Sequence, residues 1–266
     1  MYRMNALIGT PKAQIFLLLL ILFVITMSRL PVATALYLLG VCVGVCVAVD
    51  LIFAYIRRRK LFIPRAAAIT GLILALIIDP GASFIQIVVI CVAAMVVKNL
   101  LRIGNRHIFN PAASGLLIGY FLFSLSPSWW GVSLYDPGKI TLPNVLIMVS
   151  ILLLAYVSGL KLKRYATIFS FFIAYTVFSL IFLSPSSLGS LLQTVLSPGT
   201  LFYAIVMLAE PMTSPVNRNR QMMYGGLVAV FNVLFILAIT NIDGLNLPDI
   251  SLISLLVGNL VFFRLR

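Results

Sequence analysis

Two acidic residues end short apolar segments, and proline follows each of them directly. Residues 69–79 end at Asp79, and residues 200–210 end at Glu210. Each segment is too short to cross a bilayer comfortably, and the two occupy corresponding places in the two halves of the chain. Paired broken helices of this kind point to a binding site near the middle of a membrane protein.

The two acids differ in how well local structure explains them. Asp79 suits the N-cap of a helix that has proline at its first position. Glutamate is a poor N-cap, and an acid at a helix C-terminus opposes the helix dipole. Glu210, together with Thr213, is therefore the stronger functional candidate of the two, while Asp79 is kept as a candidate for an ion pathway.

A third acid, Asp50, lies inside an apolar segment, where an ionisable side chain is costly and is a functional candidate by default. Two interpretations are open: Asp50 contacts an ion or a cofactor, or it forms a buried ion pair with Lys98 or a nearby arginine that holds two helices together. Lys98, Arg102 and Arg106 recur every four residues, so we expect them on one helix face. Lys98 would be the deepest and the best site candidate, with the two arginines reaching to the inner membrane edge.

Further helix starts accompany these charges. Pairs of a capping residue and proline recur beyond Asp79-Pro80, namely at Asn110-Pro111, Ser197-Pro198 and Ser214-Pro215. Good capping explains each pair, and the helix N-termini that they create also attract anions such as phosphate or carboxylate. His107, the single histidine, is open to two interpretations: a proton relay or ligand, or a loop residue near the inner surface.

Several kinds of chemistry find no support in the sequence. There is no Ser-His-Asp set, P-loop, GxGxxG fingerprint or His/Cys metal cluster. Cys42 and Cys46 share a helix face, but apolar packing explains them better than a metal does. Trp129-Trp130 suits an aromatic anchor at a membrane interface.

Composition defines the class of protein. Of 266 residues, 62% are hydrophobic and 9% are charged, which exceeds what a soluble core needs. We predict a single integral membrane domain over residues 1–266, with a first transmembrane helix in place of a removed signal peptide. The net charge is +13, and the basic residues that cause it lie in short loops between the apolar runs. The positive-inside rule explains this pattern better than nucleic-acid binding does.

The apolar runs predict an all-α protein with about ten transmembrane helices. They lie near 13–29, 32–56, 64–79, 83–101, 111–126, 143–159, 165–183, 198–210, 221–240 and 249–263. Basic residues cluster in alternate connections, as at residues 57–60 and 161–164, which predicts that both termini are cytoplasmic. Five spans per half force the second half to be inverted, giving repeats of about 12–126 and 141–264 with one short helix in each.

An ordered set of motifs resembles a known family. Residues 68–76 resemble its S-x-x-T-G-L-L-L-A-L, Val97-Lys98 follows, and residues 108–113 resemble its F-N-P-A. Residues 197–200 and 209–214, then Arg220 and Tyr224-Gly225, resemble its S-G-x-T, T-D-P-V-T-A-S, G-R and F-G segments. The family is the RnfD/NqrB family, the membrane flavoproteins of the Rnf electron-transport complex and of the sodium-pumping NADH:quinone reductase (Nqr).

The resemblance implies a fold, a cofactor and a site. The fold would be a ten-helix inverted repeat similar to that of urea transporters, and a bound flavin would take part in one-electron transfer across a membrane. Carried onto this chain, the residues near the flavin would be Thr70, Gly71, Lys98, Asn110, Pro111, Thr200, Glu210, Thr213 and Arg220.

This chain also departs from the family pattern. The family usually carries an S-G-A-T motif after the fifth span, where threonine takes a phosphoester-linked FMN, and residues 126–139 hold no such motif. Ala209 and Glu210 stand where the family has threonine and aspartate. The prediction is therefore a flavin, riboflavin or FMN, that is held without a covalent bond.

The functional prediction is an electron-transfer subunit of the inner (plasma) membrane, with coupled ion translocation involving Asp50 and Asp79. Its expected partners are membrane lipid and other Rnf- or Nqr-like redox subunits, as part of a redox-driven oxidoreductase. Two alternatives use the same scaffold: a channel or transporter for a small solute or ion, and a structural anchor for redox partners.

Overall fold

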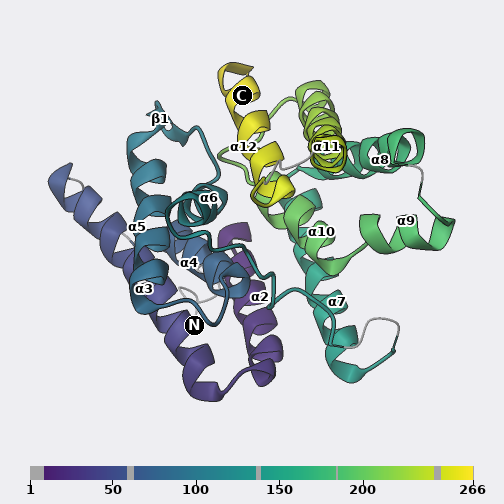
Figure 1. Cartoon of the computed structure of the whole chain (residues 1–266). Helices are drawn as coiled ribbons and strands as arrows, with labels where there is room; N and C mark the ends of the chain where they lie inside the picture. Colours follow the sequence, from purple (N-terminus) through teal and green to yellow (C-terminus); the bar gives the residue numbers. More distant parts are fainter. Residues whose placement is uncertain (1–8, 59–62, 136–138, 184, 243–246, 266) are drawn as a thin grey trace.

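Helices make up most of the chain in the computed structural model, which describes residues 9–58, 63–135, 139–183, 185–242 and 247–265 (Figure 1). The described part of the first half contains five α-helices: α2 (Pro11–Thr26), α3 (Val32–Ile56), α4 (Arg65–Ile77), α5 (Phe84–Leu100) and α6 (Pro111–Phe123). A 3-10 turn, η1 (Met27–Arg29), extends α2, and a short hairpin of β1 (Arg102–Ile103) and β2 (Arg106–His107) joins α5 to α6.

The second half is also helical. Its elements are α7 (Leu142–Tyr156), α8 (Tyr165–Phe182), α9 (Leu188–Val195), α10 (Pro198–Phe202), α11 (Arg218–Asn241) and α12 (Ile250–Phe262). Helix α7 continues as the π-helix η2 (Val157–Lys161), α10 continues as the π-helix η3 (Tyr203–Leu208), and the 3-10 turn η4 (Phe263–Leu265) follows α12. Single-turn π segments inside helices often occur at functional sites.

The expectation of an all-α membrane protein is confirmed. Among the residues that the structure describes, five helices are long and apolar enough to cross a membrane, and the pair α9 and α10–η3, bent by 43°, forms a sixth candidate span. The remaining apolar helices, α4, α5, α6 and α12, are shorter. A helix occupies each of the ten expected positions in the described residues, and the count of ten membrane crossings stays a prediction.

One helix was missed by the sequence analysis, which treated residues 184–197 as a loop. Ser187 caps α9 and forms a capping box with Ser190. The apolar positions Leu188, Leu191 and Val195 also recur with helical spacing. The eighth predicted segment is therefore the second part of a broken helix, and not an isolated short one.

The expectation that Lys98, Arg102 and Arg106 share a helix face is wrong for the two arginines. Helix α5 ends at Leu100, and Arg102 and Arg106 lie on the two strands of the hairpin. Gly104 takes φ = +58° at the turn, a conformation that glycine adopts without steric cost. The Gly104-Asn105 pair was the turn signal in the sequence.

The two halves of the chain lie side by side (Figure 1). Helix α2 packs against both α4 and α7, and α6 packs against α12. A similar packing order recurs in the halves: α3 packs on α5 and α5 on α6, while α8 packs on α11 and α11 on α12.

The basic connections come together at one end of the molecule. Lys161 donates to Gln14 at the start of α2, and Gln221 at the start of α11 donates to the carbonyl of Lys163. Arg57, after α3, donates to the carbonyl of Asn99 near the end of α5. This end is called the basic end below. Arg59, Lys60 and Arg266, which also supported the predicted orientation, lie outside the described residues.

The tryptophan pair has a role that the sequence analysis did not predict. Helix α4 ends inside the protein, and its last carbonyls need donors. The Trp130 indole donates to the Ala75 carbonyl at 3.0 Å, and the amide of Gly131 donates to the Leu76 carbonyl at 2.9 Å. Trp129 donates to Asp249 at 2.8 Å. Both indoles are thus held by hydrogen bonds within the protein, and the role of the pair as anchors at a membrane interface stays a prediction.

Candidate functional site

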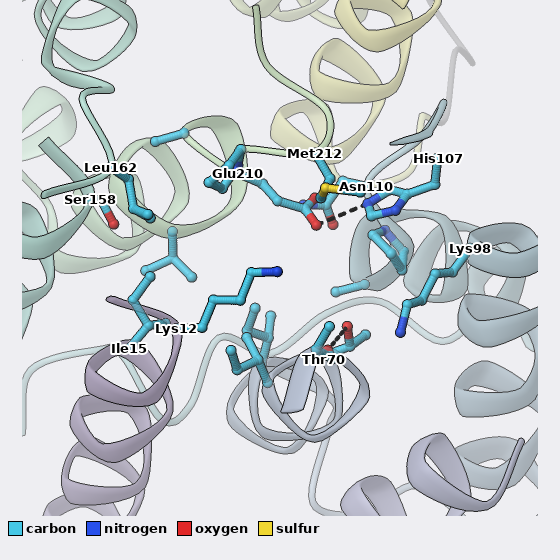
Figure 2. Close-up of a pocket in the computed structure, with 18 residues that line it drawn as sticks. Lys12, Ile15, Thr70, Lys98, His107, Asn110, Ser158, Leu162, Glu210 and Met212 are labelled. Atoms are coloured by element: carbon cyan, nitrogen blue, oxygen red, sulfur yellow. Dashed lines mark hydrogen bonds and ion pairs between the residues drawn. The ribbon is translucent and has the colours of Figure 1, made fainter. Parts of the chain in front are cut away.

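A mostly apolar cavity lies between the two halves near the basic end, with about 790 Å³ of empty volume including its open part (Figure 2). Helices α2, α4, α5 and α6 line it from the first half, and η2, η3 and the segment after η3 line it from the second half. Its polar lining residues are Lys12, Thr70, Lys98, His107, Asn110, Ser158 and Glu210. Such a combination of apolar walls and a few convergent polar groups is typical of small-molecule sites.

Glu210 is at the centre of the hydrogen bonds in this cavity. Its Oε1 lies 2.9 Å from Nε2 of His107, and its Oε2 accepts from Nδ2 of Asn110 at 3.0 Å and from Oγ1 of Thr213 at 3.2 Å. The Glu210 side chain is 23% exposed and that of His107 only 6%. Glu210 therefore joins both halves of the protein and still presents part of its carboxylate to the cavity.

A tight turn holds Glu210 in place. After η3 ends, the Glu210 carbonyl accepts from the Ser214 amide at 2.9 Å and from the Ser214 hydroxyl at 2.8 Å. Ser214 thus supports this turn, and the expectation that it caps a helix is wrong, because Asn217 is the N-cap of α11.

Arg164 also stabilises this turn, through hydrogen bonds to its backbone. This buried side chain donates to the carbonyls of Pro211 and Pro215, at either end of the segment that carries Thr213. Burial lowers the pKa of the Arg164 guanidinium, and the positive charge of Arg106 lowers that pKa further. Arg164 offers a rigid fork of donors, which suits two separate carbonyls.

Asn110 is the N-cap of α6, as expected, and it also bonds to residues of the second half. Its Oδ1 accepts from the Ala113 amide, as an N-cap should. Its Nδ2 donates to both the Met207 carbonyl and Glu210, and its own amide donates to Asn259 of α12 at 2.8 Å. One side chain therefore fixes the start of α6 against the end of η3.

His107 is brought to the cavity by the hairpin. Pairing of Arg102 with His107 places the imidazole directly before the start of α6. The hairpin thereby directs a buried histidine at Glu210 (Figure 2). His107 therefore lines the cavity and contacts Glu210, and its role as a proton relay or ligand stays a prediction.

Asp50 and Lys98 form a buried ion pair at the edge of the cavity. Nζ of Lys98 lies 3.0 Å from Oδ1 of Asp50, and Asn99 donates to the same oxygen at 3.1 Å. The second of the two interpretations of Asp50, a pair that holds two helices together, is therefore seen. Lys98 also lines the cavity, and both residues line an adjoining pocket that contains Arg57.

Lys12 is a cavity residue that the sequence analysis did not select. It lies in the first turn of α2, and its side chain reaches into the cavity (Figure 2). Within the described ranges no hydrogen bond or ion pair is seen for its ammonium group. Thr10-Pro11, a further pair of capping residue and proline, was the signal that could have placed this residue at a helix start.

Of the remaining predicted site residues, some line the cavity and others lie away from it. Thr70 and Pro111 line the cavity. Gly71 lies where α4 meets α3, and a Cβ there would come within 2.6 Å of the Val43 Cα. Thr200 lies in the first turn of α10, away from the cavity lining, and Arg220 is exposed in the first turn of α11.

Asp79 is separate from this cavity. Its Oδ1 accepts from the Gly81 amide at 2.7 Å, so it caps a turn, and Ser83 caps the following helix α5. The expectation that Asp79 is a helix N-cap is therefore wrong. Asp79 forms an Asx turn instead, and the N-cap of α5 lies four residues further along the chain, at Ser83.

Together, the fold and the cavity define a multi-pass membrane protein with a polar site between its two halves. Residues 9–137 match the sequence profile of the NQR2, RnfD, RnfE family. This match covers just under half of the chain and agrees with the resemblance found in the motifs. Comparison with curated proteins gives no match.

Proposed function

We propose that this protein is a membrane electron-transfer subunit that holds a flavin, riboflavin or FMN, without a covalent bond in the cavity between its halves. The observation that carries the proposal is the meeting of motif residues from distant segments. Thr70, Lys98 and Asn110 come from three elements of the first half, and Glu210 joins them from the second.

The residues of the cavity fit such a group. Ile69 and Ile73 of α4 and Val206 of η3 contribute apolar wall, which suits a flat aromatic ring. Asn110 and Glu210 offer a hydrogen-bonding edge, and Lys12 adds a positive charge without a partner in the described residues. A bound flavin supplies the redox chemistry, whereas the protein supplies binding, orientation and electrostatics.

Different residues of the cavity would have different roles in binding the flavin. Lys12 and Lys98 attract the electron-rich edge or the phosphate of the ligand. The hydrogen bond between Nε2 of His107 and Oε1 of Glu210 would fix the orientation of the carboxylate toward the ligand. The apolar wall excludes water, which strengthens each of these interactions.

The ten-helix inverted repeat belongs to the same proposal. Gly119 of α6 ends a Leu-Leu-Ile-Gly sequence and Gly258 of α12 a Leu-Leu-Val-Gly sequence. A Cβ at either glycine would clash with the facing helix, at Ile90 and Val228 respectively. The recurring packing order of the halves also supports the repeat. The positive-inside rule predicts that the basic end faces the cytoplasm, and coupled ion movement past Asp50 and Asp79 is part of the proposal.

Purification of the intact protein in mild detergent tests the proposal through flavin absorbance and fluorescence, before and after addition of riboflavin or FMN. We expect one bound flavin in the wild type and about tenfold weaker binding in Lys12→Ala, because hydrogen bonds to charged groups contribute roughly 1.5–3 kcal/mol. Lys139→Ala, at the opposite end, is the matched control. Absence of flavin binding, combined with solute flux in liposomes, would favour the channel alternative.

A further inference from the structure

A groove between α8 and α11 is a feature that the proposed function does not use. The two helices pack side by side (Figure 1), and the groove has about 990 Å³ of empty volume including its open side. Its lining residues are Tyr165, Ala166, Phe169, Ser170, Ile173, Ala174, Val177, Phe178, Arg218, Met222 and Gly226. It lies on the outer surface of the helix pair and is separate from the cavity that contains Glu210.

Exposed apolar side chains line the groove, and the close contact of α8 with α11 forms its base. Phe169 and Ile173 are 64% and 65% exposed, so they border the groove without being covered by the rest of the protein. Adjacent glycines of α11 differ sharply: a Cβ at Gly225 would clash with α8, whereas a Cβ at Gly226 would meet nothing within 4 Å. The helices thus touch along one line and leave an open channel beside it.

The length of the groove suits one leaflet of a bilayer. Tyr165 and Phe178 are separated by 13 positions of α8, which correspond to about 20 Å of helix. Half of the hydrocarbon core of a bilayer is about 15 Å thick. A lipid chain that begins at the basic end would therefore be covered along its whole depth in the leaflet.

The basic end of the groove is electrostatically positive. Helices α8 and α11 both begin there, since Gln221 donates to the Lys163 carbonyl at 3.0 Å. Two helix N-termini therefore add their partial positive charges. The Arg218 guanidinium lies at the mouth of the groove, 5.7 Å from the ring centre of Tyr165, and the exposed Lys163 and Arg220 are close by in the sequence.

We propose that this groove binds an anionic phospholipid, with its phosphate at Arg218 and one acyl chain along Phe169, Ile173 and Gly226. The apolar channel by itself would also suit a transmembrane helix of another protein. The positive mouth distinguishes the occupants, because a basic pocket at the cytoplasmic ends of helices is typical of binding to lipid head groups. The proposal is independent of flavin binding.

The test compares two lipids that share the same acyl chains, phosphatidylglycerol and phosphatidylcholine. Delipidated full-length protein is titrated with each lipid, and native mass spectrometry counts the lipids retained. We expect the wild type to retain phosphatidylglycerol preferentially. Arg218→Gln should weaken this binding about fivefold, the factor that corresponds to ~1 kcal/mol per basic residue near a membrane surface.

Filling the groove provides the second variant. Gly226→Leu places a side chain in open space and should abolish the preference for phosphatidylglycerol, while its thermal unfolding temperature stays at or above that of the wild type because glycine is a poor helix former. Gly44→Leu is the matched control, since a Cβ at Gly44 of α3 also meets nothing within 4 Å. Equal retention of both lipids by the wild type, or full retention by Gly226→Leu, would overturn the proposal.

Discussion

His107 and Glu210 are 103 positions apart in the sequence, yet Nε2 of the histidine lies 2.9 Å from Oε1 of the glutamate. The contact joins the hairpin of the first half to the segment after η3 in the second half. The side chain of His107 is nearly buried and that of Glu210 is partly exposed, so the histidine fixes a carboxylate that still faces the cavity. Its position makes it the centre of the proposed flavin site.

Removing the charge of Glu210 should weaken ligand binding. Glu210→Gln keeps the shape of the side chain, and we expect its affinity for flavin to fall about tenfold, because hydrogen bonds that involve charged groups contribute roughly 1.5–3 kcal/mol. Flavin fluorescence titration measures the effect. Asp79→Asn serves as control, since Asp79 caps a turn outside the cavity, and similar losses in both variants would contradict the assignment.

The Asp50–Lys98 pair should show strong coupling in stability. Asp50→Asn leaves the Lys98 ammonium buried without its counter-ion, and loss of one partner of a buried pair costs about 3–5 kcal/mol. The double variant Asp50→Asn/Lys98→Met should recover most of this loss. Thermal unfolding in detergent provides the double-mutant cycle, and additive effects of the two changes would show that the pair is not coupled.

The double variant also tests whether Lys98 contacts the ligand. If the pair only holds α3 and α5 together, the double variant should bind flavin as the wild type does. If Lys98 also attracts flavin, stability should return in the double variant while flavin affinity stays low. Parallel measurements of unfolding and flavin binding on the same samples separate these outcomes.

Ser197 and Asn110 are both N-caps that precede a proline, but their replacement by alanine should lower the free energy of unfolding by different amounts. Ser197→Ala removes the N-cap of α10 and should cost about 1 kcal/mol. Asn110→Ala removes a cap together with the bonds to Met207 and Glu210, so its cost should be larger by about 1–3 kcal/mol. Thermal unfolding of both variants makes the comparison, and equal costs would indicate that Asn110 acts only as a cap.

Arg164 should be sensitive even to a conservative change. Arg164→Lys retains the positive charge but has no fork to reach the carbonyls of both Pro211 and Pro215. We expect a loss of about 1–3 kcal/mol in unfolding free energy and weaker flavin retention, because the turn that carries Glu210 loses its support. Arg58→Lys, at an exposed position after α3, is a suitable control and should leave both quantities near the wild-type values.

Much of the architecture follows from local patterns. Apolar runs of helical length predicted a helix at ten places, and the X-Pro pairs at Asn110 and Ser197 predicted two helix starts correctly, because capping depends on neighbouring residues alone. The same approach missed α9 and the hairpin at residues 102–107. In both cases a local signal, a capping box and a Gly-Asn turn, was outweighed by the broader charge and hydropathy patterns.

The sequence by itself determined the class of protein, a resemblance to one family over its first half and the presence of ionisable groups in a costly apolar setting. The tertiary structure decided which of these groups meet. Asp50 could have paired with Lys98 or with an arginine, and packing of α3 on α5 selected Lys98. Glu210 has no partner that local spacing could reveal except Thr213, because His107 and Asn110 are about a hundred residues away and reach it only when the two halves pack together.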